Sequence, residues 1–240
     1  MTDVLLLPGL NNDARVWDGT IRALEGRGLS ARAIDLPALD SLDGIVEAIA
    51  CEVSPGVVLV GHSFGGAVAM AVADRHPDLL SGLVLVNAPT DADDDEAGRQ
   101  RRAKAERARD GEFEAMAMAG TAVVFHGERA HDPTVRAERL RGVRAYGPER
   151  YRAHNLALVD RPDRTDWTPE GVPVLVVAAE HDRVVPTDAQ RAYALRHDLD
   201  FVEIPETAHM LPAEAPESLA DQVASWMATS GIRSGRKAIS

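Results

Sequence analysis

A serine between two glycines is the residue of this chain best placed to act as a nucleophile. The sequence Gly-His-Ser-Phe-Gly at 61–65 follows an apolar run at 57–60 and precedes a helical pattern at 67–75. A strand, a sharp turn and a helix in this order expose a serine hydroxyl at the turn. The glycines allow strand and helix to approach closely, and the helix N-terminus favours negative charge that develops beside Ser63.

A serine hydroxyl is a weak nucleophile at neutral pH and needs a neighbouring base. His209 is the best candidate among the eight histidines, because it lies between a late apolar run at 201–204 and the last helical pattern, 216–229. A loop at that point faces the same sheet edge as Ser63. His62 is next to Ser63 in sequence, but we expect it to point elsewhere on the turn and to have a structural role.

The base needs a carboxylate that hydrogen-bonds its far nitrogen and fixes its tautomer. Asp182 follows the apolar run at 174–178 and comes after the serine and before the histidine in the chain. That order is typical of a serine on a strand-turn-helix motif. Two competitors remain: Glu180 is closer to the end of the strand, and Asp188 begins a helical pattern, where a carboxylate caps backbone amides.

The elements that position these residues alternate between strand and helix. Short apolar runs bounded by Gly, Pro and Asp are typical of strands buried on both faces of a parallel sheet. The sequence therefore predicts an α/β fold with a doubly wound, mostly parallel sheet, in which ligands bind beyond the carboxyl ends of the strands. The predicted strands are 4–7, 57–60, 83–86, 174–178 and 201–204, and the predicted helices are 16–25, 42–53, 67–75, 187–196 and 216–229.

One long segment breaks the alternation. From about 91 to 167 only helical patterns are found, and the first has acids at 91–96 followed by bases at 99–109. This order of charges suits a helix dipole and favours a solvated helix face over a nucleic-acid surface. We expect a helical cap insertion over the ligand-binding edge. The predicted division is a core of 1–90 and 168–230, a cap of 91–167 and a disordered tail of 231–240.

The composition of the chain restricts the classes of molecule that it is expected to bind. The chain has 240 residues, 45% of them hydrophobic, and a net charge of −12, which is typical of a globular domain that repels phosphate-rich surfaces. No apolar run is long enough to span a bilayer, and the N-terminus does not fit a signal peptide. We expect a cytoplasmic protein with a small-molecule substrate and neither nucleic acid nor membrane as partner. The single cysteine, Cys51, excludes an internal disulfide and is expected to be buried in the helix at 42–53.

Three motifs together resemble the α/β-hydrolase superfamily. They are GHSFGG at 61–66, AAEHDRVVP at 178–186 and ETAHMLPAEAPE at 206–217, and the similarity covers nearly the whole chain outside the cap. The resemblance implies Ser63, Asp182 and His209 as a catalytic triad, with no metal and no organic cofactor. Such motifs are specific for the fold and poor guides to the substrate.

The resemblance also implies an oxyanion hole made by the backbone amides of Phe64 and Leu10. This sequence has Pro8 where the family usually has histidine, and the first two strands of the usual sheet are missing, so we expect about six strands. A pocket role for Arg15 would require a substrate with a carboxylate, and packing explains Asn12 and Trp17 equally well. The candidate pocket residues are Asn12, Arg15, Trp17, Phe125, His126 and Met210.

Hydrolysis of a small carboxylic ester, thioester or lactone through an acyl-enzyme is the function that these residues favour. One alternative is a cofactor-free lyase or synthase that uses the same triad for proton abstraction. Another is a non-enzymatic binding or signalling protein on this fold. A burst of product from an activated ester would distinguish the hydrolase from both.

Overall fold

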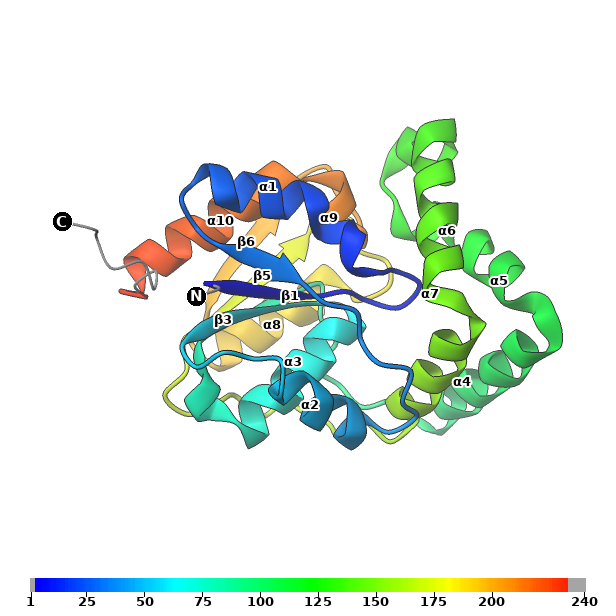
Figure 1. Cartoon of the computed structure of the whole chain (residues 1–240), viewed down its shortest axis with the longest axis horizontal. Helices are drawn as coiled ribbons and strands as arrows, with labels where there is room; N and C mark the ends of the chain where they lie inside the picture. Colours follow the sequence, from blue (N-terminus) through cyan, green and yellow to red (C-terminus); the bar gives the residue numbers. More distant parts are fainter. Residues whose placement is uncertain (1–2, 233–240) are drawn as a thin grey trace.

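The computed structural model describes residues 3–232 and contains a six-stranded sheet in the order β2-β1-β3-β4-β5-β6. Every neighbouring pair of strands is parallel. The predicted α/β fold with about six strands is therefore confirmed, and Figure 1 shows helices on both sides of the sheet. The strands are β1 (Val4–Leu7), β2 (Ala31–Ala33), β3 (Val57–His62), β4 (Leu80–Val86), β5 (Val174–Ala179) and β6 (Asp200–Ile204).

Two hydrophobic layers hold helices against the two faces of the sheet. Because successive side chains of a strand point to opposite faces, Leu5 and Leu7 of β1 belong to one layer, and Val4 and Leu6 belong to the other. The first layer includes residues of α2 (Leu42–Ala50), α3 (Phe64–Arg75) and α8 (Thr187–Arg196), and the second includes residues of α1 (Asp18–Gly26), α9 (Leu211–Glu214) and α10 (Pro216–Thr229).

Two details of the core differ from the sequence analysis. Strand β2 has no apolar run, because its three residues lie half-buried at the sheet edge, and no strand was predicted there. Helix α2 ends at Ala50, so Cys51 is the residue that follows the helix and is exposed. The prediction of a buried Cys51 is wrong, since the helix turns out to be one turn shorter than its apolar pattern.

The chain between β4 and β5 is helical, as expected, and α4 to α7 pack together beside one end of the sheet (Figure 1). Helix α4 begins at Asp95 rather than near residue 91, because the Asp94 carboxylate accepts the amide of Ala97 and caps the helix. Gly111 and Gly147 have positive φ values of 94° and 78° and produce kinks. These helices are α4 (Asp95–Arg107), α5 (Phe113–Ala119), α6 (Thr121–Val124) and α7 (Pro133–Val159), and short helical turns cover Ala14–Trp17, Pro77–Leu79, Ala108–Glu112 and Gly127–His131.

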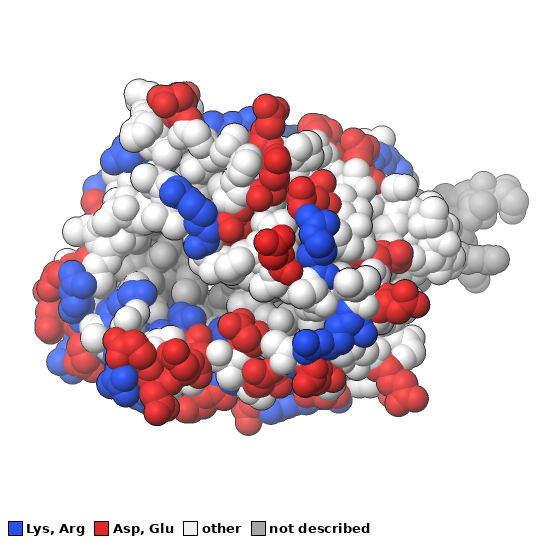
Figure 2. Space-filling view, turned by 180° about the vertical axis from the view of Figure 1, so that it is seen from behind, with Lys and Arg blue, Asp and Glu red and all other residues white. Residues whose placement is uncertain are grey.

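Charged side chains of both signs are intermixed over the face in Figure 2. The charge run of α4 lies mostly on an exposed face, as predicted, where Arg99 pairs with Glu96 at 2.7 Å. Of the helices that are described, none combines the length and the apolar character needed to cross a bilayer.

The predicted tail at 231–240 lies mainly outside the described residues, which end at 232. Within it, the amide of Ile232 donates to the carbonyl of Met227, and its side chain packs against the second hydrophobic layer. The packed chain therefore extends at least two residues beyond the predicted end of the core.

Candidate active site

Ser63 lies in a strained turn between β3 and α3. Its φ and ψ are 52° and −118°, a conformation that costs a non-glycine residue free energy and that is common at functional sites. A Cβ atom at Gly61 would collide with the backbone of Gly65, and one at Gly65 would collide with the carbonyl of Leu7. The two glycines of the motif are therefore required by the close approach of strand, turn and helix.

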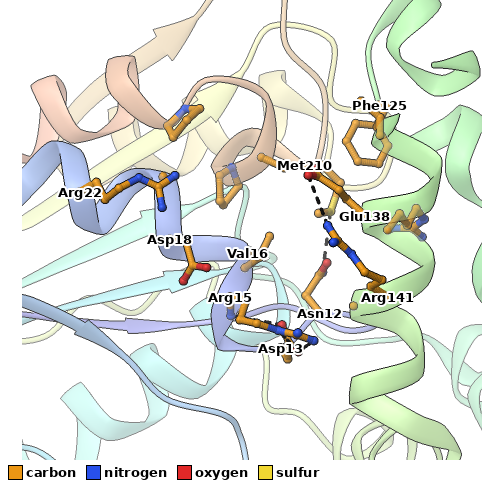
Figure 3. A pocket seen from close by; sticks show the side chains of 17 residues that line it. Asn12, Asp13, Arg15, Val16, Asp18, Arg22, Phe125, Glu138, Arg141 and Met210 are labelled. Atoms are coloured by element: carbon orange, nitrogen blue, oxygen red, sulfur yellow. Dashed lines mark hydrogen bonds and ion pairs between the residues drawn. The ribbon is translucent and has the colours of Figure 1, made fainter. Parts of the chain in front are cut away.

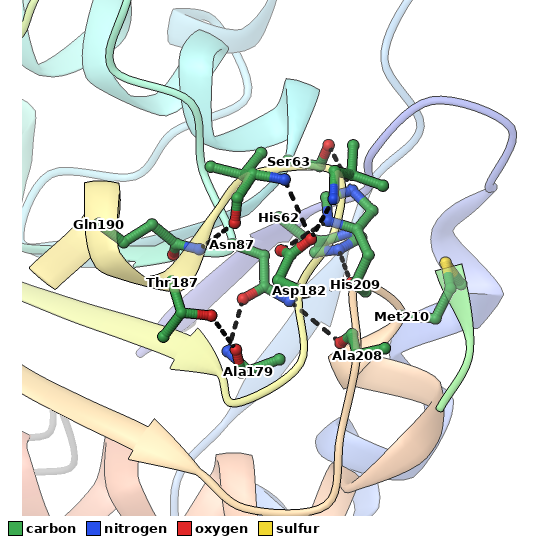
Figure 4. Close-up of polar contacts among 12 residues, drawn as sticks. His62, Ser63, Asn87, Ala179, Asp182, Thr187, Gln190, Ala208, His209 and Met210 are labelled. Carbon is green, nitrogen blue, oxygen red and sulfur yellow. Dashed lines mark hydrogen bonds and ion pairs between the residues drawn. The ribbon is translucent and has the colours of Figure 1, made fainter. Parts of the chain in front are cut away.

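Ser63, His209 and Asp182 form one continuous chain of hydrogen bonds (Figure 4). The distance from Ser63 Oγ to His209 Nε2 is 2.9 Å, and that from His209 Nδ1 to Asp182 Oδ2 is also 2.9 Å. The side chain of Asp182 is fully buried. Its second oxygen, Oδ1, accepts the amides of Val184 and Val185, which stabilise a buried carboxylate.

The two competing carboxylates do not contact His209. Glu180 is exposed, and its Oε2 accepts the amide of Glu206. Asp188 is exposed in the first turn of α8, and no side chain caps that helix, whose N-cap residue is Pro186. Among the described residues, Asp182 is the carboxylate that the structure brings to His209.

Two buried side chains, those of Asn87 and His62, form hydrogen bonds with the backbone carbonyl of His209. Nδ2 of Asn87 donates to the His209 carbonyl at 3.0 Å, while its Oδ1 accepts the amide of Ala179. His62 contacts the same carbonyl through Nε2 at 2.7 Å, in agreement with a structural role. Burial lowers the pKa of His62 to about 3, so its ring is neutral at pH 7. Asn87 is not among the candidate residues from the sequence, although a polar residue directly after β4 was the available signal.

The loop after β1 passes directly over Ser63. A Cβ atom at Gly9 would lie 3.0 Å from Ser63 Cβ, so only glycine fits there without displacement. Among the described residues, neither the amide of Leu10 nor that of Phe64 donates a hydrogen bond. Nδ2 of Asn12 donates to the Leu10 carbonyl at 2.8 Å, which fixes the orientation of this peptide. Both amides are thus free to bind a ligand oxygen.

A pair of buried residues from α7 supports this loop from the other side. Leu10 packs against the hydrophobic cluster that contains Tyr146. The Tyr146 hydroxyl lies 2.7 Å from His154 Nδ1, while His154 Nε2 lies 2.7 Å from the carbonyl of Pro37. The ring of His154 also packs against Phe64, with 4.8 Å between centroids. His154 falls within the predicted cap at 91–167 and is not among the candidate site residues, because its partners are distant in sequence.

Burial of His154 makes the stability of the fold depend on pH. Burial lowers the pKa of this residue from 6.5 to about 4, so the unfolded chain binds the proton more tightly than the folded chain. Stability should therefore fall as the pH falls from about 6.5 to 4, by about 2 kcal/mol between pH 7 and pH 5 for this one group. Urea unfolding at both pH values should show a smaller difference for His154→Gln. An unchanged difference would assign the acid sensitivity to other groups.

Four of the six candidate pocket residues line a cavity of about 470 Å³: Asn12, Arg15, Phe125 and Met210 (Figure 3). Its connection to the site runs through Met210, which follows His209, and through Asn12, which bonds the Leu10 carbonyl. Trp17 is fully buried in the second hydrophobic layer, where its ring packs edge-on against His62. His126 stacks on His181 at 4.5 Å and lines neither of the two described pockets. For Trp17 and His126 the structure therefore supports packing in place of the expected pocket role.

Comparisons with known proteins place this architecture in a family. Residues 4–222 match the model of the alpha/beta hydrolase family. A pimeloyl-[acyl-carrier protein] methyl ester esterase of Nitrosomonas europaea is 36% identical over 92 residues, which are 35% of this chain and only 36% of that relative. The alignment thus spans about a third of the relative's length.

Solved structures agree with this chain over much more of its length. A thermophilic esterase from Thermogutta terrifontis, determined with malate bound, is 26% identical with a TM-score of 0.86, covering 96% of this chain and 90% of that one. The enol-lactonase from Burkholderia xenovorans shares the fold at 19% identity and a TM-score of 0.80, covering 95% and 92%. Since the family model spans nearly all of the described residues, the chain belongs to the alpha/beta hydrolase family.

Proposed function

We propose that this chain is a serine hydrolase that cleaves small carboxylic esters, thioesters or lactones through an acyl-enzyme. The observation that carries the proposal is the unbroken hydrogen-bond chain from Asp182 through His209 to Ser63, with the serine held in a strained turn at the head of α3. A serine hydroxyl in contact with a base that a third group orients is the arrangement that activates a nucleophile.

Each of these residues has a defined step. Ser63 Oγ attacks the carbonyl carbon while its proton moves to His209 Nε2, and Asp182 stabilises the imidazolium that forms. The oxygen that becomes negative accepts hydrogen bonds from the Leu10 and Phe64 amides. His209 then protonates the leaving alcohol, thiol or lactone oxygen as its bond to the acyl carbon breaks. Water repeats the sequence and releases the acid.

The relatives support this chemistry at the level of a class. An esterase and an enol-lactonase both cleave an acyl–oxygen bond, and their structures match at least 95% of this chain. The helices at 91–167 would serve as the cap that limits the size of the substrate.

An assay with p-nitrophenyl esters of graded acyl length tests the proposal. We expect a burst of p-nitrophenol close to one equivalent per enzyme, followed by slower turnover, together with labelling of Ser63 by a fluorophosphonate. Labelling of Ser63 without turnover of any ester would favour a lyase or synthase. Absence of labelling in the folded protein would favour a binding protein.

The proposed oxyanion hole can be tested through Leu10. Leu10→Pro removes the N–H, and kcat should fall on the order of a hundredfold or more, as for loss of one oxyanion donor. Leu10→Ala keeps the N–H and should change kcat only modestly, through packing of the side chain. Steady-state kinetics with one p-nitrophenyl ester measures both.

Proline also restricts the backbone, so the loop itself needs a control. Leu10→Pro should keep its melting temperature and still react slowly at Ser63 with a fluorophosphonate. If this folded variant hydrolyses the ester at the parent rate, Leu10 is not the donor and Asn11 becomes the candidate.

A further inference from the structure

Arg139 of α7 is a buried cation without an acidic partner. It is 8% exposed, and among the described residues no carboxylate lies within ion-pair distance of it. Its Nη2 donates to the carbonyl of Ala117 at 2.9 Å, and its Cζ lies 6.0 Å from the centre of the Phe125 ring. Its Nε is buried and has no hydrogen-bond partner.

A charge in this position is expensive to maintain. Desolvation of an ion costs several kcal/mol unless an opposite charge and hydrogen bonds replace the lost water. Burial lowers the pKa of Arg139 to about 10, with no acidic side chain opposing the shift, so the guanidinium remains charged at pH 7. One carbonyl and one aromatic ring are incomplete compensation for it. The arrangement therefore points to an anion that binds here.

Arg139 is one of the residues that line the cavity, and Met210 is another. Phe125, against which Arg139 lies, packs on Met210, the residue that follows His209. Asn12 contacts Met210 Sδ and the Leu10 carbonyl, so the same wall of the cavity continues to the proposed oxyanion loop. Figure 3 shows the cavity between the N-terminal segment that carries Asn12 and helix α7. A volume of about 470 Å³ suits part or all of a small molecule.

The charged side chains that line the cavity have an excess of one positive charge. Four arginines and three carboxylates line it, although the whole chain has a net charge of −12. Arg15 pairs with Asp13 at 2.6 Å, and Arg141 pairs with Glu138 at 3.3 Å. A single carboxylate would neutralise the excess, whereas a phosphate would bring up to two negative charges. The planar guanidinium also matches the geometry of a carboxylate.

We propose that this cavity binds a carboxylate carried by the ester substrate and that Arg139 is its ion-pair partner. The inference rests on the proposed hydrolase function and narrows it to esters or lactones of acids with a second, ionised carboxyl group. Arg139 is then a residue that determines specificity.

Two matched substrates test the inference. Monomethyl glutarate carries a free carboxylate, and the methyl ester of glutaramic acid carries a neutral amide of the same size in its place. The parent should prefer the carboxylate substrate in kcat/KM. Arg139→Met should reduce this preference by roughly tenfold or more, since loss of one partner of a buried charge pair is costly. Arg139→Lys keeps the charge and should retain part of the preference.

Arg144→Met is the matched control, because it removes the same charge from the same helix outside the cavity. Arg144 is exposed and pairs with Glu114 at 2.7 Å. The preference should stay within about twofold in this variant. An equal loss in both variants would indicate a general electrostatic effect and would overturn the assignment. A preference unchanged in folded Arg139→Met would assign Arg139 a packing role against Ala117 only.

Calorimetric titration of glutarate into Ser63→Ala separates this inference from the proposed function. Binding that is lost in Ser63→Ala/Arg139→Met supports the carboxylate site even if the parent hydrolyses no ester, in which case only the hydrolase proposal fails. Ester hydrolysis by the parent together with no glutarate binding and no carboxylate preference would leave the hydrolase intact and overturn the carboxylate site. Inorganic phosphate that binds more tightly than glutarate would also overturn it.

Discussion

Ser63→Ala should reduce ester hydrolysis by roughly four powers of ten or more, because loss of the nucleophile removes the acyl-enzyme route altogether. The Ser63 hydroxyl bonds His209, and its backbone amide remains bonded to the Val86 carbonyl whatever the side chain. Alanine has the same difficulty as serine at a φ of 52°, so the turn gains no new strain. The fold should therefore persist while turnover is lost.

Melting temperature and single-turnover kinetics check this expectation. Ser54→Ala, at an exposed position away from the site, is the matched control and should keep parent activity. If folded Ser63→Ala retains hydrolysis within about tenfold of the parent, Ser63 is not the nucleophile.

Asp182→Asn should lower kcat by about 10⁴-fold, with little effect on KM, because it places the histidine proton on the wrong nitrogen. Oδ1 of residue 182 accepts two backbone amides, so the oxygen of the new amide group should stay there. Its NH₂ group then faces His209 Nδ1 and donates to it. The proton moves to Nε2, which faces Ser63 and can no longer accept the serine proton.

The competing carboxylates supply the controls. Glu180→Gln and Asp188→Asn should have mild effects, because both side chains are exposed and neither contacts His209. A pH-independent loss in Asp182→Asn, with the melting temperature maintained, would support the change of tautomer. A larger loss in Glu180→Gln than in Asp182→Asn would contradict the assignment of the acid.

Local patterns in the sequence were sufficient to predict the α/β fold. Four of the six strands, β1, β3, β4 and β5, are apolar runs buried on both faces, and β6 is a weaker run that is mostly half-buried. The serine motif lies where a strand, a turn and a helix follow one another. Parallel strands bring their carboxyl ends to one edge. The loops that carry Ser63, Asp182 and His209 could therefore be predicted to converge. Strand β2 could not be predicted, because pairing with β1 at a half-exposed edge requires no apolar run.

Only the tertiary structure decided which side chains surround that edge, because these contacts join segments far apart in the chain. Asn87 reaches the His209 loop, 122 residues away, and His154 reaches Pro37, 117 residues away. Whether an aromatic residue such as Trp17 packs in the core or lines a pocket depends on the helices opposite it. The same holds for Arg139, which the sequence presents as one more arginine of a charged helix. Its burial beside Phe125, without a carboxylate within reach, is a property of the folded molecule alone, since pairing depends on every element packed around it.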